Sequence, residues 1–384
     1  MLHLAITTLL AMQTASGSPY VAPGTPAPGE APQETPAAST PAPTPRSRPT
    51  PRRSPTPGPK ASNDLLVVVN KSDNAVSILD ASTGKLRFTV PAEKGPHEVE
   101  VLADGKMAAV SDYGKSGDPG RLVLLIDLAT GKVVSRVDIG EGSRPHGLKA
   151  LKDGRLLVTA EGTRELVVVD PKAAKVTQRI STGRDVSHMV AASPDGRRAY
   201  VSSLANGVVT VIDLKAGKVL THVATGKGAE GIDVTPDGRE VWVSNRDANT
   251  ISIIDTGLLQ AVFTIRAAEF PIRVKITPDG RRALVSFTGS GDVGVFDVAT
   301  RAEVKRIPIG RDAVEGTQSR VFQKRFGTSP APVGLVVSSD GTRAWVSATH
   351  ADVVAVIDLA NLRIDDAWVA GREPDGLAGR FGRR

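Results

Sequence analysis

The sequence predicts an all-β protein, a seven-bladed β-propeller of four-stranded antiparallel blades. Short hydrophobic runs that each end in Asp recur seven times, at intervals of 47, 43, 43, 42, 42 and 61 residues. Asp-Gly dipeptides, which are typical of tight hairpin turns, recur in step with these runs. A period near 42 residues built from β-branched runs and tight turns is typical of propeller blades, so seven copies predict seven blades. The runs end at Asp80, Asp127, Asp170, Asp213, Asp255, Asp297 and Asp358.

The elements of one repeat are expected in a fixed order. An inner strand such as GIDVTP (231–236) ends at an Asp-Gly turn, and a second strand such as VWVS (241–244) follows. After a variable loop, the third strand ends at the Asp that marks the repeat, and a turn that often contains Gly-Lys leads to the fourth strand. The Asp-Gly turns lie at 104–105, 153–154, 195–196, 237–238, 279–280 and 340–341.

Two incomplete repeats at the ends of this region are expected to form one blade. Residues 64–92 supply second, third and fourth strands without an inner strand, and EPDGLAGRF (373–381) has the pattern of an inner strand with nothing after it. Pairing the two closes the ring with strands from both ends of the chain, which removes free sheet edges. The propeller is therefore expected to span residues 61–384.

The residues before the propeller are expected to export and space it. The apolar run LHLAITTLLAM (2–12) precedes a string of small residues, which fits a signal peptide over residues 1–17 and is too short to span a membrane. No Lys or Arg precedes the run, so an N-terminus that stays in the cytoplasm is the alternative. Residues 18–60 hold 14 of the 27 prolines and predict a disordered linker. We expect a periplasmic, cell-surface or extracellular protein with no transmembrane segment after signal removal.

Composition argues against several classes of function. The chain has no cysteine, so it can form no disulfide and offers no thiolate metal ligand. For the same reason we expect no c-type haem. It has no GxxxxGK[ST] or GxGxxG motif, so no nucleotide cofactor is expected. Basic residues are scattered and aromatic residues make up 4% of the chain, which argues against nucleic-acid binding. A closed ring leaves no free strand edge to recruit a second copy, so a monomer is expected.

Three phrases carry a resemblance to a known family. They are SPDGRRAYVSS (193–203), TPDGREVWVSN (235–245) and TPDGRRALVSF (277–287), and they resemble the YVTN-type propeller repeat of exported bacterial and archaeal proteins. The resemblance covers roughly residues 62–380. Propellers related to that family include surface-layer proteins, lactonase-like proteins and the haem-binding domain of a nitrite reductase. The resemblance therefore implies the fold and leaves the function open.

Three histidines stand at equivalent positions where successive inner strands begin. They occur in GPHEV (95–99), RPHGL (144–148) and VSHMV (186–190). Loops that lead into inner strands lie at one mouth of the central channel of a propeller, so these side chains are expected to converge there. We call this the mouth position. In chain order it holds His97, His146, His188, Glu230, Ile272, Val333 and Asp375.

Imidazoles and a carboxylate that converge on an axis predict a metal site. His97, His146, His188 and Glu230 are the expected ligands of one zinc, copper or iron ion, with an open coordination position for water or substrate. The alternative is that the histidines only hydrogen-bond adjacent loops. Duplication alone predicts the same residue in every blade, whereas this position varies from His to Glu to Ile.

Further residues are expected to contribute to ligand binding at this mouth. Asp112 and Glu161 follow second strands and either orient the imidazoles or are ordinary polar residues of the rim. Arg144 and Arg273 are candidates to hold an anionic ligand, and Asp375 completes the set. Two long loops, after Asp112 and around DAVEGTQSRVFQKRFGTSP (312–330), are expected on the same face as binding elements or tolerated insertions.

Two functions of different classes remain open. The first is an exported binding module with a small-ligand or metal site at the channel mouth, whose partner is a small ligand, a cell-envelope polymer or an envelope protein. The second is a metal-dependent enzyme, a lyase, hydrolase or oxidoreductase, that uses the His/His/His/Glu site. No nucleophile or general base is identifiable, so the catalytic residues are unknown and the first function is preferred.

Overall fold

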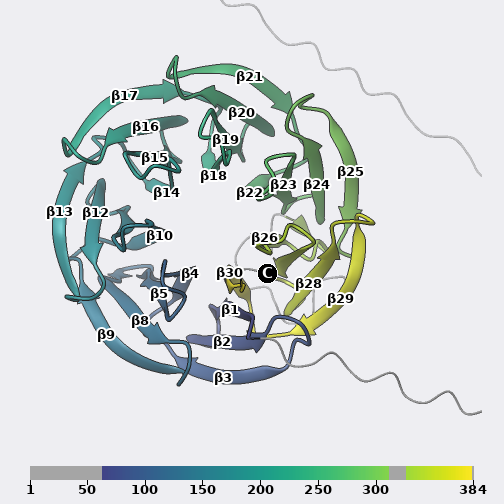
Figure 1. Ribbon diagram of the computed structural model, residues 1–384, viewed down its shortest axis with the longest axis horizontal. Coiled ribbons are helices and arrows are strands. Elements are labelled where there is room, and N and C mark those ends of the chain that lie inside the picture. Colours follow the sequence, from purple (N-terminus) through teal and green to yellow (C-terminus); the bar gives the residue numbers. More distant parts are fainter. Residues whose placement is uncertain (1–62, 311–325, 383–384) are drawn as a thin grey trace, which may run out of the picture. The chain divides into compact units, whose positions relative to one another are not determined.

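Seven four-stranded antiparallel sheets surround a central axis in the computed structural model, which describes residues 63–310 and 326–382 (Figure 1). This confirms the predicted all-β, seven-bladed propeller. The predicted signal peptide (1–17) and linker (18–60) lie outside the described residues, as do residues 312–325 of the long loop expected over 312–330. None of the described residues forms a helix long and apolar enough to cross a membrane.

Each blade runs from the channel outward through four strands, in the predicted order. The inner strands are β4 (Pro96–Val101), β10 (Pro145–Ala150), β14 (Ser187–Ala192), β18 (Ala229–Val234), β22 (Pro271–Ile276), β26 (Pro332–Val337) and β30 (Pro374–Arg380). The second strands are β5 (Met107–Asp112), β11 (Leu156–Ala160), β15 (Arg198–Ser203), β19 (Glu240–Asn245), β23 (Arg282–Phe287), β27 (Arg343–Ala348) and β1 (Leu65–Asn70).

The outer half of each blade follows the repeating Asp. The third strands are β8 (Leu122–Asp127), β12 (Glu165–Asp170), β16 (Val208–Asp213), β20 (Thr250–Asp255), β24 (Asp292–Asp297), β28 (Val353–Asp358) and β2 (Ala75–Asp80). The outer strands are β9 (Lys132–Asp138), β13 (Lys175–Ser181), β17 (Lys218–Ala224), β21 (Gln260–Arg266), β25 (Glu303–Pro308), β29 (Arg363–Val369) and β3 (Leu86–Pro91). A two-stranded hairpin, β6 (Gly114–Lys115) and β7 (Asp118–Pro119), is inserted after β5.

The repeating Asp shapes the turn that follows each third strand. Oδ1 of Asp127 accepts hydrogen bonds from the backbone N–H groups of Ala129, at 3.0 Å, and Thr130, at 2.8 Å. Asp213 makes the same pair of bonds two and three residues onward. A short carboxylate that bonds to its own backbone stabilises a tight turn, which explains why Asp recurs in the sequence with the period of the blades.

The core lies between neighbouring blades. Second and third strands are buried along nearly their whole length, because each sheet lies between two neighbouring sheets and packs one face against each of them. One cluster joins Leu66 and Leu79 of the closing blade to Trp345 and Val354 of the preceding blade. Outer strands such as β13 alternate between exposed and partly buried residues, as expected for strands with one face in solvent.

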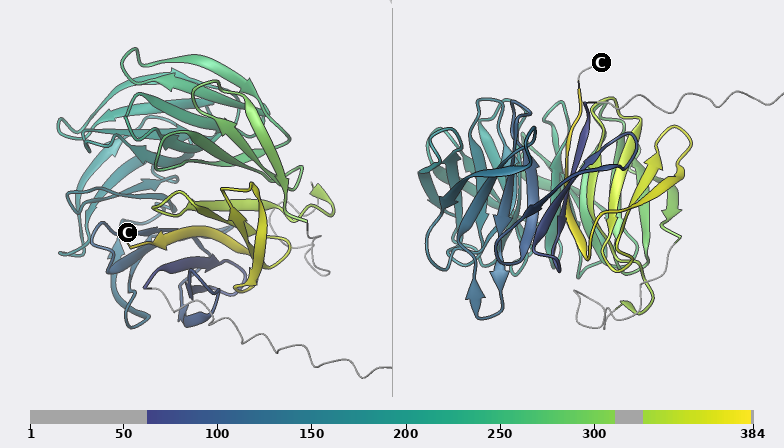
Figure 2. Two further views of the ribbon diagram at one scale, coloured as in Figure 1. Left: turned by 45° about the vertical axis from the view of Figure 1, so that its right-hand side comes forward. Right: turned by 90° about the horizontal axis from the view of Figure 1, so that it is seen from below.

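The closing blade combines strands from both ends of the propeller, as predicted. Strand β30 pairs antiparallel with β1, with Leu65 opposite Arg380 and Val67 opposite Ala378. The sheet order is β3-β2-β1-β30. Figure 2 shows the β6–β7 hairpin projecting from one end of the ring, while β30 ends at the other.

Candidate functional site

In five blades, a hydroxyl group in the second strand bonds to the inner strand of its own blade and to the inner strand of the next blade. Thr159 accepts a hydrogen bond from the N–H of Gly147, at 2.8 Å, and donates one to the carbonyl of His188 in the next blade, at 2.6 Å. Ser202 bonds in the same way to the N–H of Met189 and the carbonyl of Glu230. The device recurs at Ser244, Ser286 and Ser347, whose hydroxyls donate to the carbonyls of Ile272, Val333 and Asp375.

Glycine at the next position lets the inner strands approach one another. The residue after the mouth position is glycine in four blades, at Gly147, Gly231, Gly334 and Gly376. A Cβ atom at Gly231 would lie 2.1 Å from the carbonyl oxygen of Ile272 in the next blade. The narrow ring that results brings the mouth side chains within contact of one another.

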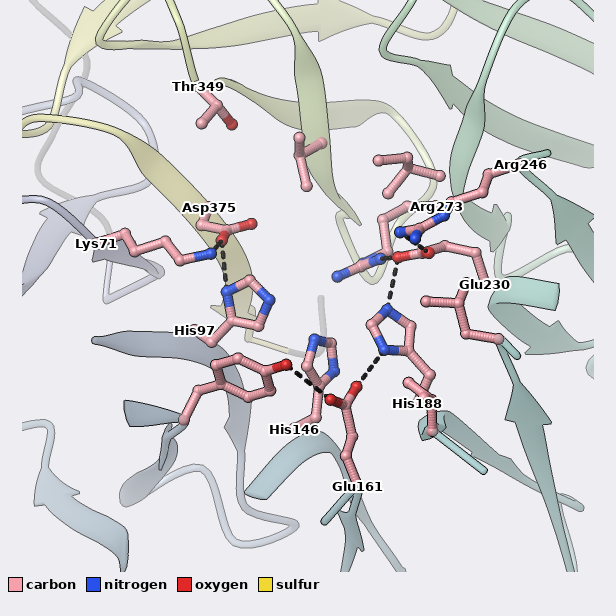
Figure 3. Close-up of a pocket in the computed structure, with 15 residues that line it drawn as sticks. Lys71, His97, His146, Glu161, His188, Glu230, Arg246, Arg273, Thr349 and Asp375 are labelled. Atoms are coloured by element: carbon pink, nitrogen blue, oxygen red, sulfur yellow. Dashed lines mark hydrogen bonds and ion pairs between the residues drawn. The ribbon is translucent and has the colours of Figure 1, made fainter. Parts of the chain in front are cut away.

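The mouth side chains converge on one cavity of about 220 Å³ (Figure 3). All seven mouth residues line it, as do Glu161 and Arg273 of the predicted set. Lys71, Tyr113, Arg246 and Thr349 also contribute to its wall. The structure therefore brings the seven mouth residues to one cavity, while the role of His97, His146, His188 and Glu230 as metal ligands stays a prediction.

His146 is the uncompensated group of this cavity. Its side chain is buried, with the residue 1% exposed, and neither ring nitrogen has a hydrogen-bond partner. It packs between His97 and His188, with ring centroids 4.4 Å and 3.9 Å away. Burial, helped by the nearby positive charge of His188, holds the pKa of His146 well below its usual value. His146 is thus a neutral imidazole, the form that coordinates metals.

His188 is held as an imidazolium between two carboxylates. Nδ1 lies 2.5 Å from Oε1 of Glu161, and Nε2 lies 2.7 Å from Oε1 of Glu230. Burial by itself lowers the pKa of His188, but the two carboxylates outweigh burial and raise that pKa to about 9. Both ring nitrogens are therefore occupied, unlike those of His146.

His97 is paired with Asp375 on the opposite side of the arc. Nδ1 of His97 lies 2.7 Å from Oδ2 of Asp375, and Nζ of Lys71 lies 3.2 Å from the same oxygen. Burial opposes ionisation of Asp375, but His97 and Lys71 hold its pKa below the usual range. The second ring nitrogen of His97 points into the cavity beside His146 (Figure 3).

Arg273 crosses the channel and forms the floor of the cavity. Its guanidinium pairs with Glu98 on the far side, and Nη1 lies 3.0 Å from Oε1 of Glu230. Arg246 pairs with the other oxygen of Glu230 at 2.8 Å. The sequence suggested that Arg273 binds an anionic ligand, whereas in the structure its guanidinium pairs with the carboxylates of Glu98 and Glu230.

Arg144 and Asp112 lie outside the cavity lining. Arg144 stacks on the ring of Tyr113, with Cζ 4.4 Å from the ring centroid, and Tyr113 donates a hydrogen bond to Oε2 of Glu161 at 2.8 Å. Arg144 therefore reaches the site only through Tyr113. Asp112 is buried at the base of the β6–β7 hairpin, where burial raises its pKa to about 6.

Glu98 and Arg246 are site residues that sequence analysis missed. Glu98 and Arg273 both follow a mouth position, at the place where four blades have glycine. Two charges of opposite sign at a position that is otherwise glycine or Met189 were a readable signal of a pair across the channel. Arg246 directly follows the second-strand sequence VWVSN (241–245), and nothing in its local sequence distinguishes it from other arginines of the repeat.

Comparisons with known proteins support the fold. Residues 155–272 match the family model of the cytochrome D1 heme domain, less than a third of the chain. A hydrazine synthase chain of Kuenenia stuttgartiensis has a TM-score of 0.58 and 20% identity, covering 69% of this chain and 77% of that chain. A functionally unknown protein from Desulfotomaculum acetoxidans DSM 771 has a TM-score of 0.67 and 16% identity, covering 83% of this chain and 99% of that chain. No curated protein sequence matches the chain.

The match to a heme-domain family corrects the cofactor expectation. The expectation that the protein has no c-type haem was wrong, because residues 155–272, which include His188 and Glu230, match the family model of the cytochrome D1 heme domain. The absence of cysteine removes covalent thioether attachment and leaves coordination by histidine available. Haem therefore belongs among the cofactors to be tested at this site.

The residues fit haem iron in chemistry and only partly in space. Histidine is a common axial ligand of haem iron, and His146 supplies a neutral imidazole with no other partner. The cavity of about 220 Å³ is below the roughly 300–1,000 Å³ of pockets that enclose organic ligands. The cavity as it stands admits a coordinated metal and does not enclose a macrocycle.

Proposed function

We propose that the protein is an exported, monomeric propeller of the YVTN type that binds a metal centre at the channel mouth, with His146 as the first ligand. The observation that carries the proposal is the buried imidazole of His146, whose two nitrogens have no partner. A buried polar group without a hydrogen bond costs stability, so its retention points to a partner that binds.

The groups around His146 provide further donors at metal-binding distances. Two sets of three side chains have potential ligand atoms within 4.8 Å of one another, and His146 belongs to both. One set adds His97 and Glu98, and the other adds Glu161 and His188. Because Glu98 is paired with Arg273 and His188 with two carboxylates, His97 is the most available second ligand.

Asp375 would orient His97 for this role. A ligating histidine commonly gives its other ring nitrogen to a carboxylate, which fixes the ring and increases its basicity. The contact between Nδ1 of His97 and Asp375 leaves the other nitrogen directed into the cavity. Lys71, on the same carboxylate oxygen, holds Asp375 in place.

The pairing of the remaining charges favours a binding module over an enzyme. Arg273, Arg246 and His188 all pair with Glu230, and Tyr113 bonds to Glu161. Catalysis requires a base or nucleophile free to act on a substrate, and these groups are already committed to one another. A small ligand coordinated beside His146 is the partner that this cavity supports.

The test is the metal content of the full chain purified without a His-rich tag. Elemental analysis and the absorption spectrum, before and after reconstitution with metal ions or with haem, distinguish a metal ion from haem iron. We expect about one metal per chain in the wild type and in the control His222→Ala, which changes an outer-strand histidine, and loss of that metal in His146→Ala. Metal bound equally by His146→Ala, or by none of the proteins, would contradict the proposal.

A further inference from the structure

A second cavity occupies the opposite end of the channel. Its volume is about 330 Å³, and it shares no lining residue with the histidine cavity. Arg273 and Glu98, which form an ion pair, stand on β22 and β4 between the mouth residues and the residues of these strands that line the second cavity. The second cavity opens among the Asp-Gly turns, since Pro278 and Ser339 of two such turns line it. It is large enough for an organic ligand of modest size.

In six of the seven blades, the third residue after the mouth position lines this cavity. Around the ring these six residues are Glu100, Lys149, Asp233, Lys275, Val336 and Ala378, and the seventh, Ala191, is packed in the core. One part of the ring is therefore charged, and the part that begins next to Lys275 is apolar. Leu377, Val337 and Phe381 extend the apolar part.

The two acidic residues are already used by the fold. Glu100 accepts a hydrogen bond from the N–H of Ala150 in the next blade and lies 3.4 Å from Nζ of Lys149. Asp233 accepts the N–H of Ile276 in the next blade at 2.9 Å. Each carboxylate thus joins two inner strands, and Glu100 also neutralises Lys149.

Lys275 is the cation left over. Within residues 63–310 and 326–382, its ammonium has no carboxylate at ion-pair distance, and it is half-buried beside Val336 of the next blade. A half-buried ammonium next to an apolar wall attracts an anion that also carries apolar surface.

The apolar wall is a surface built at the rim of the cavity. The ring of Phe381 stacks on Trp345, with centroids 5.0 Å apart and planes 11° apart. Gly379 makes room for that ring, since a Cβ there would lie 2.0 Å from it. Phe381, held in this way, is part of the cavity lining.

We propose that this cavity binds a monocarboxylate with a short aliphatic tail, the carboxylate on Lys275 and the tail against Val336, Leu377 and Phe381. The site is separate from the histidine cavity and does not depend on a metal being bound there. A carboxylate on Lys275 would supply the missing counter-charge, and the tail would cover apolar surface that faces the channel.

The test is calorimetric titration of the full chain with hexanoate, and with hexylamine and 1-hexanol as ligands of the same tail. We expect saturable one-to-one binding of hexanoate and binding at least about tenfold weaker for the other two, because a charge-assisted hydrogen bond is lost. Lys275→Gln should weaken hexanoate by about tenfold or more. The exposed Lys305→Gln is the matched control, and His146→Ala should leave hexanoate binding unchanged.

A second variant tests the tail independently of the head group. Phe381→Ala should reduce the gain in affinity from butanoate to hexanoate while leaving the preference for carboxylate over amine. The proposal is overturned if hexanoate does not bind, if hexanol binds equally well, or if Lys275→Gln and Lys305→Gln have the same affinity for hexanoate.

Discussion

The rings of His146 and His188 lie with their centroids 3.9 Å apart, and the two side chains hold opposite protonation states. His188 has a carboxylate at each nitrogen and is an imidazolium, whereas His146 has no partner and is neutral. Each state supports the other, because the charge of His188 disfavours a second charge on its neighbour. The arc of three similar residues therefore contains one neutral imidazole without a hydrogen-bond partner and one imidazolium that pairs with two carboxylates.

The ion pairs of His188 should make stability depend on alkaline pH in the metal-free protein. The folded-state pKa of about 9 is above the usual 6.5, so the contribution is fully present below pH 6.5 and is lost as pH rises through 9. We expect a loss on the order of 1–3 kcal/mol across this window. Chemical unfolding at several pH values would show it, and His188→Gln should flatten the curve. An unchanged slope in His188→Gln would refute the assignment.

Removal of Arg273 should cost far more than removal of an exposed arginine. Arg273→Met removes the cation that pairs with the buried carboxylates of Glu98 and Glu230. Breaking a buried ion pair in this way typically costs about 3–5 kcal/mol of unfolding free energy. Arg239→Met, at an arginine side chain that is 85% exposed, is the control and should change stability by less than about 0.5 kcal/mol. In the double variant Arg273→Met with Glu98→Gln, the cost should be smaller than the sum of the single costs. Additive costs would show that the two residues are not coupled.

Substitution of two inter-blade hydroxyl residues should distinguish a loss of stability from a loss of metal binding. Thr159→Val and Ser244→Ala each leave one buried N–H and one buried carbonyl without a partner, so each should lose about 1–3 kcal/mol. Thr159 holds the N–H of Gly147, next to His146, and the carbonyl of His188, whereas Ser244 holds the N–H of Gly231 and the carbonyl of Ile272, which adjoin neither His146 nor His97. Only Thr159→Val is expected to weaken metal binding, measured by titration. Equal weakening in both variants would argue against local positioning.

Asp112 should destabilise the fold at neutral pH. Burial raises the pKa of Asp112 to about 6 from 3.8, so its contribution is most favourable at low pH and is lost as pH rises through 6. Asp112→Asn should therefore gain stability over the wild type between pH 4 and pH 7, by an amount on the order of 1–3 kcal/mol. The measurement is chemical unfolding of both proteins at pH 4 and pH 7. The same difference in unfolding free energy between the two proteins at both pH values would contradict this expectation.

The sequence predicts the propeller and most of the residues that line the cavity, but not which of their side chains form ion pairs with one another. The repeating Asp and the Asp-Gly turns report local backbone geometry, so they fixed the strand order, the closure through β30 and the mouth positions. Arg273 and Glu98 lie 175 positions apart, and their contact depends on the diameter of the channel and on the backbone irregularity at each strand start. Such distances follow from packing, which a repeat period does not encode. The commitment of His188 to two carboxylates was hidden for the same reason.

The most direct measurement is nitrogen-15 NMR of the full chain with labelled histidine. The signals of His146 among the six histidines are assigned by their loss in His146→Gln. Before addition of zinc or haem, His146 should give the signals of a neutral imidazole while His188 gives those of an imidazolium. Addition of one equivalent of the metal ion or haem that the protein binds should shift or broaden the His146 signals before those of the other histidines. A charged His146, or His146 signals that stay unchanged while zinc, copper, iron and haem are each titrated to excess, would contradict its role as the ligand.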